Sequence, residues 1–207
     1  MAHDCVNLIQ LCLFDIFLST GNVSKEEYDL KIIAGKFKGR SLKIQNKGLR
    51  PTTAIVKASL FNIIGNEIKD KSFVDVFAGT GAVGFEAASR GASSVTFIEQ
   101  NPEAVYLLNE NIRHLGACAQ VVKRDAHKFL LSPSGPYDYI FFSPPYDVIH
   151  WHKLLRAIEG SKVTHENTIM ILQHPKNIAV ESFELEKVDE RKYGFNKLTF
   201  LKKKKEQ

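Results

Sequence analysis

The stretch Asp75–Gly84 reads Asp-Val-Phe-Ala-Gly-Thr-Gly-Ala-Val-Gly and combines a carboxylate with closely spaced glycines. Gly79 and Gly81 predict a tight turn whose backbone can come close to a ligand, because a side chain would block both the turn angles and the approach. Asp75 follows an apolar stretch, where a carboxylate can meet a cationic amino group. Glu99 follows the glycines by about 20 residues, at the spacing where an acid can accept hydrogen bonds from a ribose diol. These residues favour a cofactor with an amino-acid end and a nucleoside end, and S-adenosylmethionine has that shape.

The same residues leave other interpretations open. Gly79–Gly84 also matches the G-x-G-x-x-G pattern of dinucleotide folds, which predicts a nicotinamide or flavin enzyme, although Asp75 stands where those strands are usually apolar. Alternatively, the glycines only close a strand-turn-helix unit, and Glu99 is a solvated acid at a helix start. A third acid, Asp125, can accept from an adenine amino group or cap the helix expected over 126–131, and one side chain cannot easily do both. The order strand, turn, helix, strand and acid favours the cofactor site.

A second stretch, Ser143-Pro-Pro-Tyr146, has the residue types that methylation of a nucleobase amine requires. Such an amine is a poor nucleophile because its lone pair is delocalised into the ring, so it needs acceptors for its N–H groups and a surface that fixes the base. The Ser143 hydroxyl and the Pro144 carbonyl can accept from the amine, and Tyr146 can stack on an extruded base. Pro144 and Pro145 fix a rigid turn. The proton can leave late to water, so the chemistry requires no strong general base.

Alternating strands and helices must position these two stretches. Apolar runs predict strands over 73–77, 95–98, 119–122, 137–142 and 168–172, with helices over 82–90, 101–115, 126–131 and 151–159. Residues 182–188 and 196–201 are expected to form a hairpin through Gly194. This alternation is typical of an α/β protein with a doubly wound sheet, in which ligands bind beyond the carboxyl ends of the central strands. Both stretches follow such strands, so we expect one shared cleft.

Residues 31–66 contain many basic residues and no acidic one, which predicts a surface that binds the phosphates of a nucleic acid. The basic residues are Lys31, Lys36, Lys38, Arg40, Lys43, Lys47, Arg50 and Lys57. The segments 32–33 and 42–44 are expected to be the strands of a hairpin. Phe37, between them, either stacks on a base or is buried beneath a solvated basic face.

A helix is expected to follow this hairpin and to run through Ile64, with Thr52 or Thr53 as its N-cap. Arg50 and the start of this helix together predict an anion-binding corner, because the first backbone N–H groups of a helix attract negative charge. The alternative is a capping turn with an incidental arginine. We expect Lys36, Lys38, Arg40, Arg50 and Thr52 to hold RNA phosphates.

The 207 residues are enough for one substantial domain, expected over 31–207 after an N-terminal extension over 1–30 of uncertain structure. The net charge of +5 favours a polyanionic partner. The apolar stretch 6–18 is too short to span a bilayer, so we expect no membrane partner. Lys202–Lys205 are expected to form a frayed basic tail.

Cysteine and histidine usage predicts no disulfide framework and no metal site. Cys5, Cys12 and Cys118 are too few and too irregularly spaced for either, and the histidines lack the spacing of metal ligands. We therefore expect reduced thiols and a cytoplasmic location. The protein is also expected to be a monomer.

The chain resembles the class I S-adenosylmethionine-dependent methyltransferases that modify exocyclic amines and, more narrowly, the bacterial 16S ribosomal RNA guanine-N2 methyltransferase family. The resemblance runs from about Lys31 to Leu201. It rests on the segments Ile32–Gly35, Gly39–Arg40, Leu49–Thr52, Phe77–Ala82, Gly84, Glu86–Ala87, Ser89–Ala92, Ile98–Glu99 and Pro144–Tyr146. One position departs from the family pattern, because Ser143 stands where its members usually carry Asp.

The resemblance implies a Rossmann-like domain with a seven-stranded, mostly parallel sheet that ends in an antiparallel strand. It implies S-adenosylmethionine as cofactor and ribosomal RNA, within the small subunit, as partner. The residues expected to hold the cofactor are Asp75, Phe77, Gly79, Gly81, Glu99, Gln100, Asp125 and Ala126. The hydroxyl of Ser143 accepts more weakly than a carboxylate. An adenine or cytosine amine as target, or an RNA-binding homologue with weakened catalysis, therefore stays open beside guanine N2.

Overall fold

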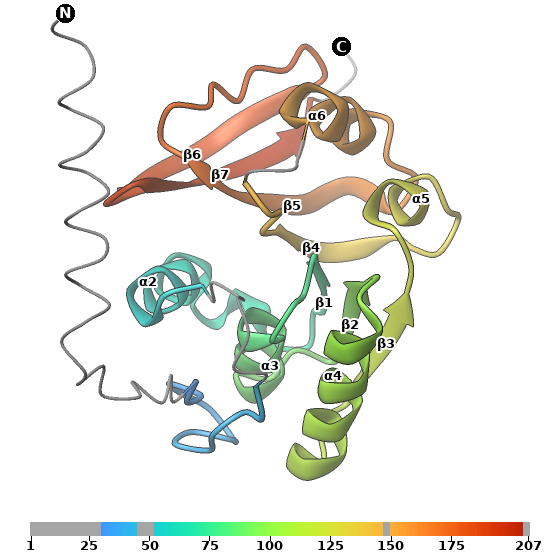
Figure 1. Cartoon of the computed structure of the whole chain (residues 1–207). Coiled ribbons are helices and arrows are strands. Elements are labelled where there is room, and N and C mark those ends of the chain that lie inside the picture. Colours follow the sequence, from blue (N-terminus) through green and yellow to red (C-terminus); the bar gives the residue numbers. More distant parts are fainter. Residues whose placement is uncertain (1–29, 45–51, 147–149, 205–207) are drawn as a thin grey trace, which may run out of the picture.

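A seven-stranded sheet forms the centre of the protein in the computed structural model, which describes residues 30–44, 52–146 and 150–204 (Figure 1). The strands are β1 (Ser72–Val76), β2 (Ser94–Glu99), β3 (Ala119–Lys123), β4 (Tyr137–Phe142), β5 (Thr164–Pro175), β6 (Leu185–Tyr193) and β7 (Asn196–Lys203). The helices are α2 (Ala54–Ile64), α3 (Ala82–Ser89), α4 (Pro102–Leu115), α5 (Ala126–Leu130) and α6 (Trp151–Glu159), with the 3-10 helix η1 (Gly65–Ile68) after α2.

The strands lie in the order β3-β2-β1-β4-β5-β7-β6. The first five pair in parallel, β7 pairs antiparallel with β5, and β6 pairs antiparallel with β7. This arrangement confirms the Rossmann-like sheet with an antiparallel strand that the family resemblance implies. The last residue of β1, Val76, pairs with the last residue of β4, Phe142. The glycine turn and the Ser-Pro-Pro-Tyr stretch therefore leave the sheet at neighbouring points.

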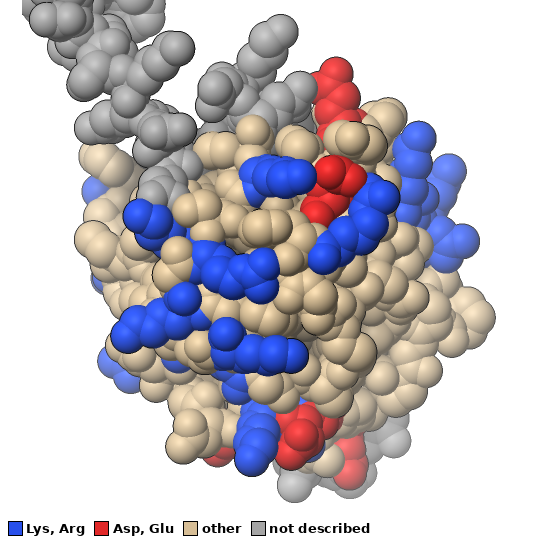
Figure 2. All heavy atoms as spheres, turned by 90° about the horizontal axis from the view of Figure 1, so that it is seen from below, with Lys and Arg blue, Asp and Glu red and all other residues tan. Residues whose placement is uncertain are grey.

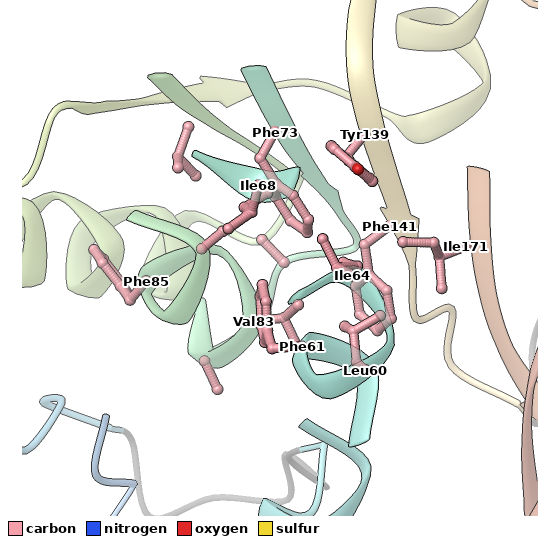
Figure 3. Packing of buried hydrophobic residues seen from close by; sticks show 14 of the residues in the cluster. Leu60, Phe61, Ile64, Ile68, Phe73, Val83, Phe85, Tyr139, Phe141 and Ile171 are labelled. Carbon is pink, nitrogen blue, oxygen red and sulfur yellow. The ribbon is translucent and has the colours of Figure 1, made fainter. Parts of the chain in front are cut away.

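Two apolar cores, one on each face of the sheet, hold the helices in place. Helices α2, α3 and α4 cover one face and α5 and α6 cover the other (Figure 1). Because side chains alternate between the faces of a strand, Phe73 of β1 packs in the first core and Val74 in the second. Figure 3 shows the first core, where Phe61 of α2 and Val83 of α3 lie against the strands. The start of α3, at Ala82, is thereby fixed to the sheet.

The expected helix ends are confirmed by their caps. The Thr53 hydroxyl accepts from the Val56 amide at 3.4 Å and begins α2. The Asn101 side chain accepts from two amides at the start of α4, and Gly116 ends that helix with a φ of 62°. Strand β5 is longer than the expected 168–172, because it continues at both ends into pairs with β4 and β7.

Lys202, Lys203 and Lys204 do not form the frayed tail that the sequence predicts for Lys202–Lys205, and Lys205 lies outside the described residues. Lys202 and Lys203 belong to β7 and pair with β6. The Lys203 ammonium donates to the Ser161 carbonyl at 3.2 Å, and the Lys204 amide donates to the Glu184 carbonyl at 2.9 Å. Backbone pairing that the charge pattern does not reveal fixes this stretch.

The N-terminal hairpin, residues 30–44, is shorter in its pairing than the sequence predicts. The expected strands at 32–33 and 42–44 reduce to one bridge between Lys31 and Ser41, with a few further backbone hydrogen bonds. Phe37 is 4% exposed, so the prediction that it stacks on a base is wrong and the burial alternative is right. The phenyl ring belongs to the first apolar core, and the cations of Lys36 and Arg40 lie 5.4 and 5.9 Å from its centre.

Glu86 of α3 docks this hairpin onto the domain. Its carboxylate is fully buried and accepts from the amides of Ile33 and Ala34 at 2.8 and 3.0 Å. It also pairs with Lys57 at 3.4 Å and with Arg90 at 2.8 Å. The place of Lys57 in the basic block suggests that it belongs to a phosphate-binding surface. That prediction is wrong, because Lys57 is only 2% exposed.

The remaining N-terminal predictions concern residues that the structure does not describe. Among them are the extension before Leu30, with Cys5 and Cys12, and the expected phosphate contact Arg50. Within the described ranges, no helix is long and apolar enough to cross a membrane.

Candidate functional site

A cavity of about 440 Å³ opens beyond the carboxyl ends of β1, β2 and β4. The glycine turn and the Ser-Pro-Pro-Tyr stretch both line it, as the shared strand ends require. The expected site residues that line it are Thr52, Asp75, Phe77, Gly79, Glu99, Gln100, Ala126, Ser143, Pro144, Pro145 and Tyr146. Two stretches far apart in the sequence therefore face one hollow.

The turn after β1 has an unusual backbone that opens it towards the cavity. Phe77, Gly79 and Gly81 have φ values of 63°, 52° and 73°, in the region that favours glycine. A Cβ at Gly79 would meet nothing closer than 3.9 Å, so a ligand can approach its backbone. Gly81 does not line the cavity, and a Cβ there would come within 2.5 Å of Leu108. Gly81 is thus required by packing beneath the turn as well as by its conformation.

Glu99, at the end of β2, fixes this turn from the neighbouring strand. One carboxylate oxygen accepts from the Gly79 amide at 2.9 Å, and the other accepts from the amides of Gln100 and Asn101 at 2.8 and 2.9 Å. Two carboxylate oxygens offer about four lone-pair positions, so one remains for a further donor such as a ribose hydroxyl. The carboxylate can hold the turn and still contact a ligand in the cavity.

Asp75 is a buried acid in the cavity wall. It is 2% exposed, and its carboxyl accepts from the Gly84 amide at 2.9 Å. Burial raises the pKa of Asp75 to about 8, the Gly84 amide opposes this shift, and the charge of Glu99 adds to it. A cation in the cavity would favour the ionised form of Asp75, because a nearby positive charge stabilises a carboxylate that burial has removed from water. This wall fits the cationic amino group of an amino acid.

The Ser-Pro-Pro-Tyr stretch extends the sheet by one residue before it turns. The Ser143 amide donates to the Val76 carbonyl at 3.3 Å, which ties the corner to the end of β1. Pro144 is buried and Pro145 is exposed, and neither can donate a backbone hydrogen bond. The corner therefore holds its position without a regular strand or helix.

Gln173 of β5 holds the far end of this corner, and the sequence offered no sign of it. Its side-chain amide donates to the Tyr146 hydroxyl at 3.1 Å, and its carbonyl oxygen accepts from the Thr52 hydroxyl at 3.1 Å. The Tyr146 ring also lies 6.1 Å from the ring of Trp151. Gln173 is 5% exposed, so this bridge between the start of α2 and Tyr146 is mostly shielded from water.

Other lining residues were also missed by sequence reasoning. Arg124 and Asn196 contribute polar side chains, and Thr53, Thr80 and Phe141 contribute further wall. Arg124 follows β3 directly, so the rule that ligands bind beyond strand ends could have found it. Asn196 and Gln173 lie at the junction of β5 with β7, and only the three-dimensional pairing brings them to the cavity.

Asp125 does not line the cavity. Its side chain caps α5 by accepting from the Lys128 amide at 3.1 Å, which is the alternative to an adenine contact. The neighbours Arg124 and Ala126 reach the cavity wall instead. An adenine contact by Asp125 stays a prediction.

The expected phosphate-binding residues of the hairpin lie away from the cavity. Lys36 and Lys38 are exposed, and the hairpin packs against Ser89, about 10 Å further along α3 than Ala82 at the cavity wall. The face seen from below in Figure 1, where the hairpin and one end of α4 lie, carries more Lys and Arg than Asp and Glu (Figure 2). Arg40 is partly committed, because its guanidinium donates to the carbonyls of His114 and Leu115 at the end of α4.

Metal-ligating side chains do not gather anywhere in the described part of the chain: no group of three or more His, Cys, Asp or Glu residues is placed to hold an ion. The buried His174 contacts the Thr199 hydroxyl at 2.8 Å and the Pro175 carbonyl at 2.9 Å. Its ring therefore belongs to the packing between β5 and β7.

The strand order, the glycine turn after β1 and the acid that ends β2 define a Rossmann-like class I methyltransferase fold. The chain belongs to the family described as "Conserved hypothetical protein 95", whose model matches residues 30–202. This family assignment agrees with the resemblance found in the sequence motifs.

Comparisons with known proteins agree with this assignment. The chain is 31% identical over 182 residues to the "Putative rRNA methyltransferase YlbH" of Bacillus subtilis. This match covers 84% of this chain and 99% of that relative. It is 40% identical over 119 residues to "Ribosomal RNA small subunit methyltransferase D" of Escherichia coli, a match that spans 56% of this chain and only 60% of that relative. A solved structure titled "Putative methyltransferase yhhF from Escherichia coli" aligns with a TM-score of 0.75 and 26% identity, over 84% of this chain and 97% of the other.

Proposed function

We propose that this protein transfers a methyl group from S-adenosylmethionine to the exocyclic N2 of a guanine in 16S ribosomal RNA of the small subunit. One observation carries the proposal: the glycine turn and the Ser143–Tyr146 corner line the same cavity. The printed names of the relatives support ribosomal RNA as the substrate class. The corner supplies the acceptors and the aromatic ring that a nucleobase amine needs.

The cofactor end of the cavity offers two carboxylates, Asp75 and Glu99, that would serve S-adenosylmethionine as hydrogen-bond acceptors. When bound, this cofactor supplies a methyl group on a positively charged sulfur. Asp75 would meet its amino group, and the free lone pair of Glu99 would accept from its ribose. Phe77, Gly79, Gln100 and Ala126 would form the surrounding wall. Gly81 would act from beneath, by giving the turn its shape.

The base end of the cavity is formed by the corner. The Ser143 hydroxyl and the Pro144 carbonyl would accept hydrogen bonds from the guanine amine, which keeps its nitrogen lone pair aimed at the methyl group. Tyr146, held through Gln173, would stack on the base. These acceptors would hold the amine while it takes up the methyl group that the cofactor supplies, and the proton that the amine loses would pass to water.

Ser143 favours a second candidate for the target atom. A neutral hydroxyl accepts more weakly than the carboxylate usual in the family, and related amino-methylases that act on cytosine N4 use Ser-Pro-Pro-Tyr. The alternative substrate is therefore an adenine or cytosine amine in DNA or RNA. The alternative function is that of an RNA-binding homologue with weakened catalysis.

The basic part of the domain, residues 31–66, would hold RNA at a distance from the target base. Lys36 and Lys38 are exposed at the far end of α3, so they would contact a segment that lies beyond the target nucleotide. Thr52 lines the cavity itself. Arg50, which lies outside the described residues, would add a further phosphate contact. Such widely spaced contacts suit an assembled small subunit in the cytoplasm, bound by one copy of the protein.

A methyl-transfer assay with tritiated S-adenosylmethionine tests the proposal. The substrates are naked 16S ribosomal RNA and small subunits that lack the modification, and nucleoside mass spectrometry identifies the product. We expect N2-methylguanosine, with faster transfer to the subunits. A different methylated base would support the alternative substrate, and tight RNA binding without any transfer would support the weakened homologue.

A further inference from the structure

The turn between β6 and β7 presents an aromatic side chain to solvent. Phe195 is 75% exposed, although its backbone is fixed, because its carbonyl accepts from the Lys176 amide at 2.9 Å. Gly194 gives the turn its shape with a φ of 58°. The Lys176 ammonium lies 5.1 Å from the centre of the phenyl ring. A held backbone thus carries an exposed ring with a cation beside it.

This turn lies at the edge of the cavity. Asn196, the next residue, lines the cavity and pairs with Pro175 at the end of β5. The same strand carries Gln173, which holds Tyr146. A single exposed apolar residue needs no special explanation, so the argument rests on place: Phe195 stands one residue from the wall of the cavity that would receive the base.

We propose that Phe195 and Lys176 form a subsite for a nucleotide that flanks the target in single-stranded RNA. A base that enters the cavity must leave its stack, which uncovers a face of its neighbour. The Phe195 ring can replace the lost stacking partner, and Lys176 can contact the adjoining phosphate. The inference rests on the proposed function in that it takes RNA as the substrate. With three quarters of its surface exposed, the ring has room for a base beside the lysine.

Phe183 provides a matched control on the same hairpin. It is 96% exposed and lies near Lys204, beyond the opposite end of the β6–β7 pairing. Asn196 and Lys203 mark the two ends of β7, roughly 23 Å apart at the strand rise of about 3.3 Å per residue. Phe183→Ala therefore removes a ring that is even more exposed than Phe195 and lies far from the cavity.

The test measures filter binding of labelled 16S ribosomal RNA transcript to the full chain, together with the KM for small subunits. Stacking of a base on an aromatic ring is worth about 1–3 kcal/mol, so Phe195→Ala should raise the Kd by about fivefold or more. Phe195→Trp should restore or tighten binding, whereas Phe195→Leu should not. Phe183→Ala should leave the Kd within about twofold of the wild-type value, by the same scale. The affinity for S-adenosylmethionine and the melting temperature should not change.

The outcomes separate this subsite from the proposed function. If Phe195→Ala binds RNA as the wild type does, or if leucine serves as well as tryptophan, the stacking subsite is wrong even where methyl transfer proceeds. If the wild type transfers no methyl group but its RNA binding depends on Phe195, the proposed function fails and the subsite stands. The subsite would also be wrong if Phe183→Ala raised the Kd for the transcript as much as Phe195→Ala does.

Discussion

The side-chain amide of Gln173 donates a hydrogen bond to the hydroxyl of Tyr146, with 3.1 Å between the nitrogen and the oxygen. The same glutamine accepts from Thr52, so one residue of β5 joins the start of α2 to the corner that would present the base. Both contacts are partly buried, where an unmet polar group is costly. The bond therefore fixes the tilt of the Tyr146 ring rather than merely accompanying it.

Gln173→Met should lower kcat for methyl transfer by about tenfold, because loss of the bond is worth about 1–2 kcal/mol of Tyr146 orientation. Tyr146→Phe should have a similar effect, and the double variant should be no worse than either single variant, since all three lack the same bond. Thr52→Val removes the other contact of Gln173 but leaves the bond to Tyr146, so it should have a smaller effect on kcat at saturating small subunits. Steady-state kinetics with small subunits measure kcat for each variant. A double variant whose loss of kcat equals the product of the two single losses would contradict the prediction.

In the proposed mechanism, Ser143 would determine how strongly the amine nitrogen of the target base is held. Ser143→Ala should lower kcat by about tenfold or more while the affinity for S-adenosylmethionine stays the same, because a transition-state acceptor is lost and the cofactor wall is untouched. Ser143→Asp should raise kcat for guanine N2, since a carboxylate accepts more strongly. Isothermal titration and single-turnover transfer separate the two quantities. An alanine variant with full kcat would remove Ser143 from the mechanism.

Local patterns predicted helix ends in this fold and the two turns that line the cavity. Asn101 and Gly116 set the ends of α4 by side-chain capping and by a left-handed φ, both of which are properties of single residues. The glycines after β1 and the prolines after β4 fix turns in the same local way. Parallel pairing then brings both turns to one edge of the sheet. These parts of the site were therefore predictable.

Pairing between distant segments decided what the sequence could not reveal. Gln173 and Asn196 meet at the cavity only because β7 pairs antiparallel with β5. Lys57 looks like one more cation in a basic block, yet the buried carboxylate of Glu86 removes it from the surface. Asp125 had two possible roles, a contact with adenine or a helix cap. The backbone amide of Lys128 is close in the sequence, so it competes with a ligand for the Asp125 carboxylate. Local charge patterns do not carry such information.

Glu86 should be the residue on which the docking of the N-terminal hairpin depends most. Glu86→Gln should lower the free energy of unfolding by about 3 kcal/mol, because it removes one partner of a buried ion pair and weakens two backbone contacts. Lys57→Met should cost less, since Arg90 still pairs with the carboxylate. Urea denaturation measures both. Lys43→Met, which breaks an exposed pair with Glu110, is the control and should change stability little.

Asp75 should make stability depend on pH in the direction opposite to an ordinary acid. Its pKa is about 8 in the folded protein and about 4 in an unfolded chain, so the folded state binds the proton more tightly. Its contribution to stability is fully present below about pH 4 and is lost as the pH rises towards about 8. Asp75→Asn should remove this loss, so its advantage in urea midpoint over the wild type should grow from about pH 5 to about pH 8.

Asp138 provides the control for this pH dependence. Burial alone would raise its pKa, but hydrogen bonds from Ser72 and the ammonium of Lys71 bring the pKa below the ordinary value. The Asp138 carboxyl is therefore ionised throughout that pH range, and Asp138→Asn should shift the midpoint by the same amount at every pH. A wild-type midpoint that tracks Asp75→Asn at all pH values would show that Asp75 is ionised in the folded protein.

Lys36 and Lys38 should contribute to RNA affinity without taking part in methyl transfer. The double variant Lys36→Ala/Lys38→Ala removes two exposed cations, so the slope of log Kd against log salt should fall by about 1.5, as expected for two lost phosphate contacts. Its kcat at saturating small subunits should not change, because these side chains lie about 10 Å beyond the cavity end of α3. Lys153→Ala/Arg156→Ala removes the same charge from α6, on the other face of the sheet, and should leave the slope unaltered. If both pairs changed the slope equally, the basic hairpin would attract RNA only through net charge, and the contacts that orient the substrate would have to come from the rim of the cavity.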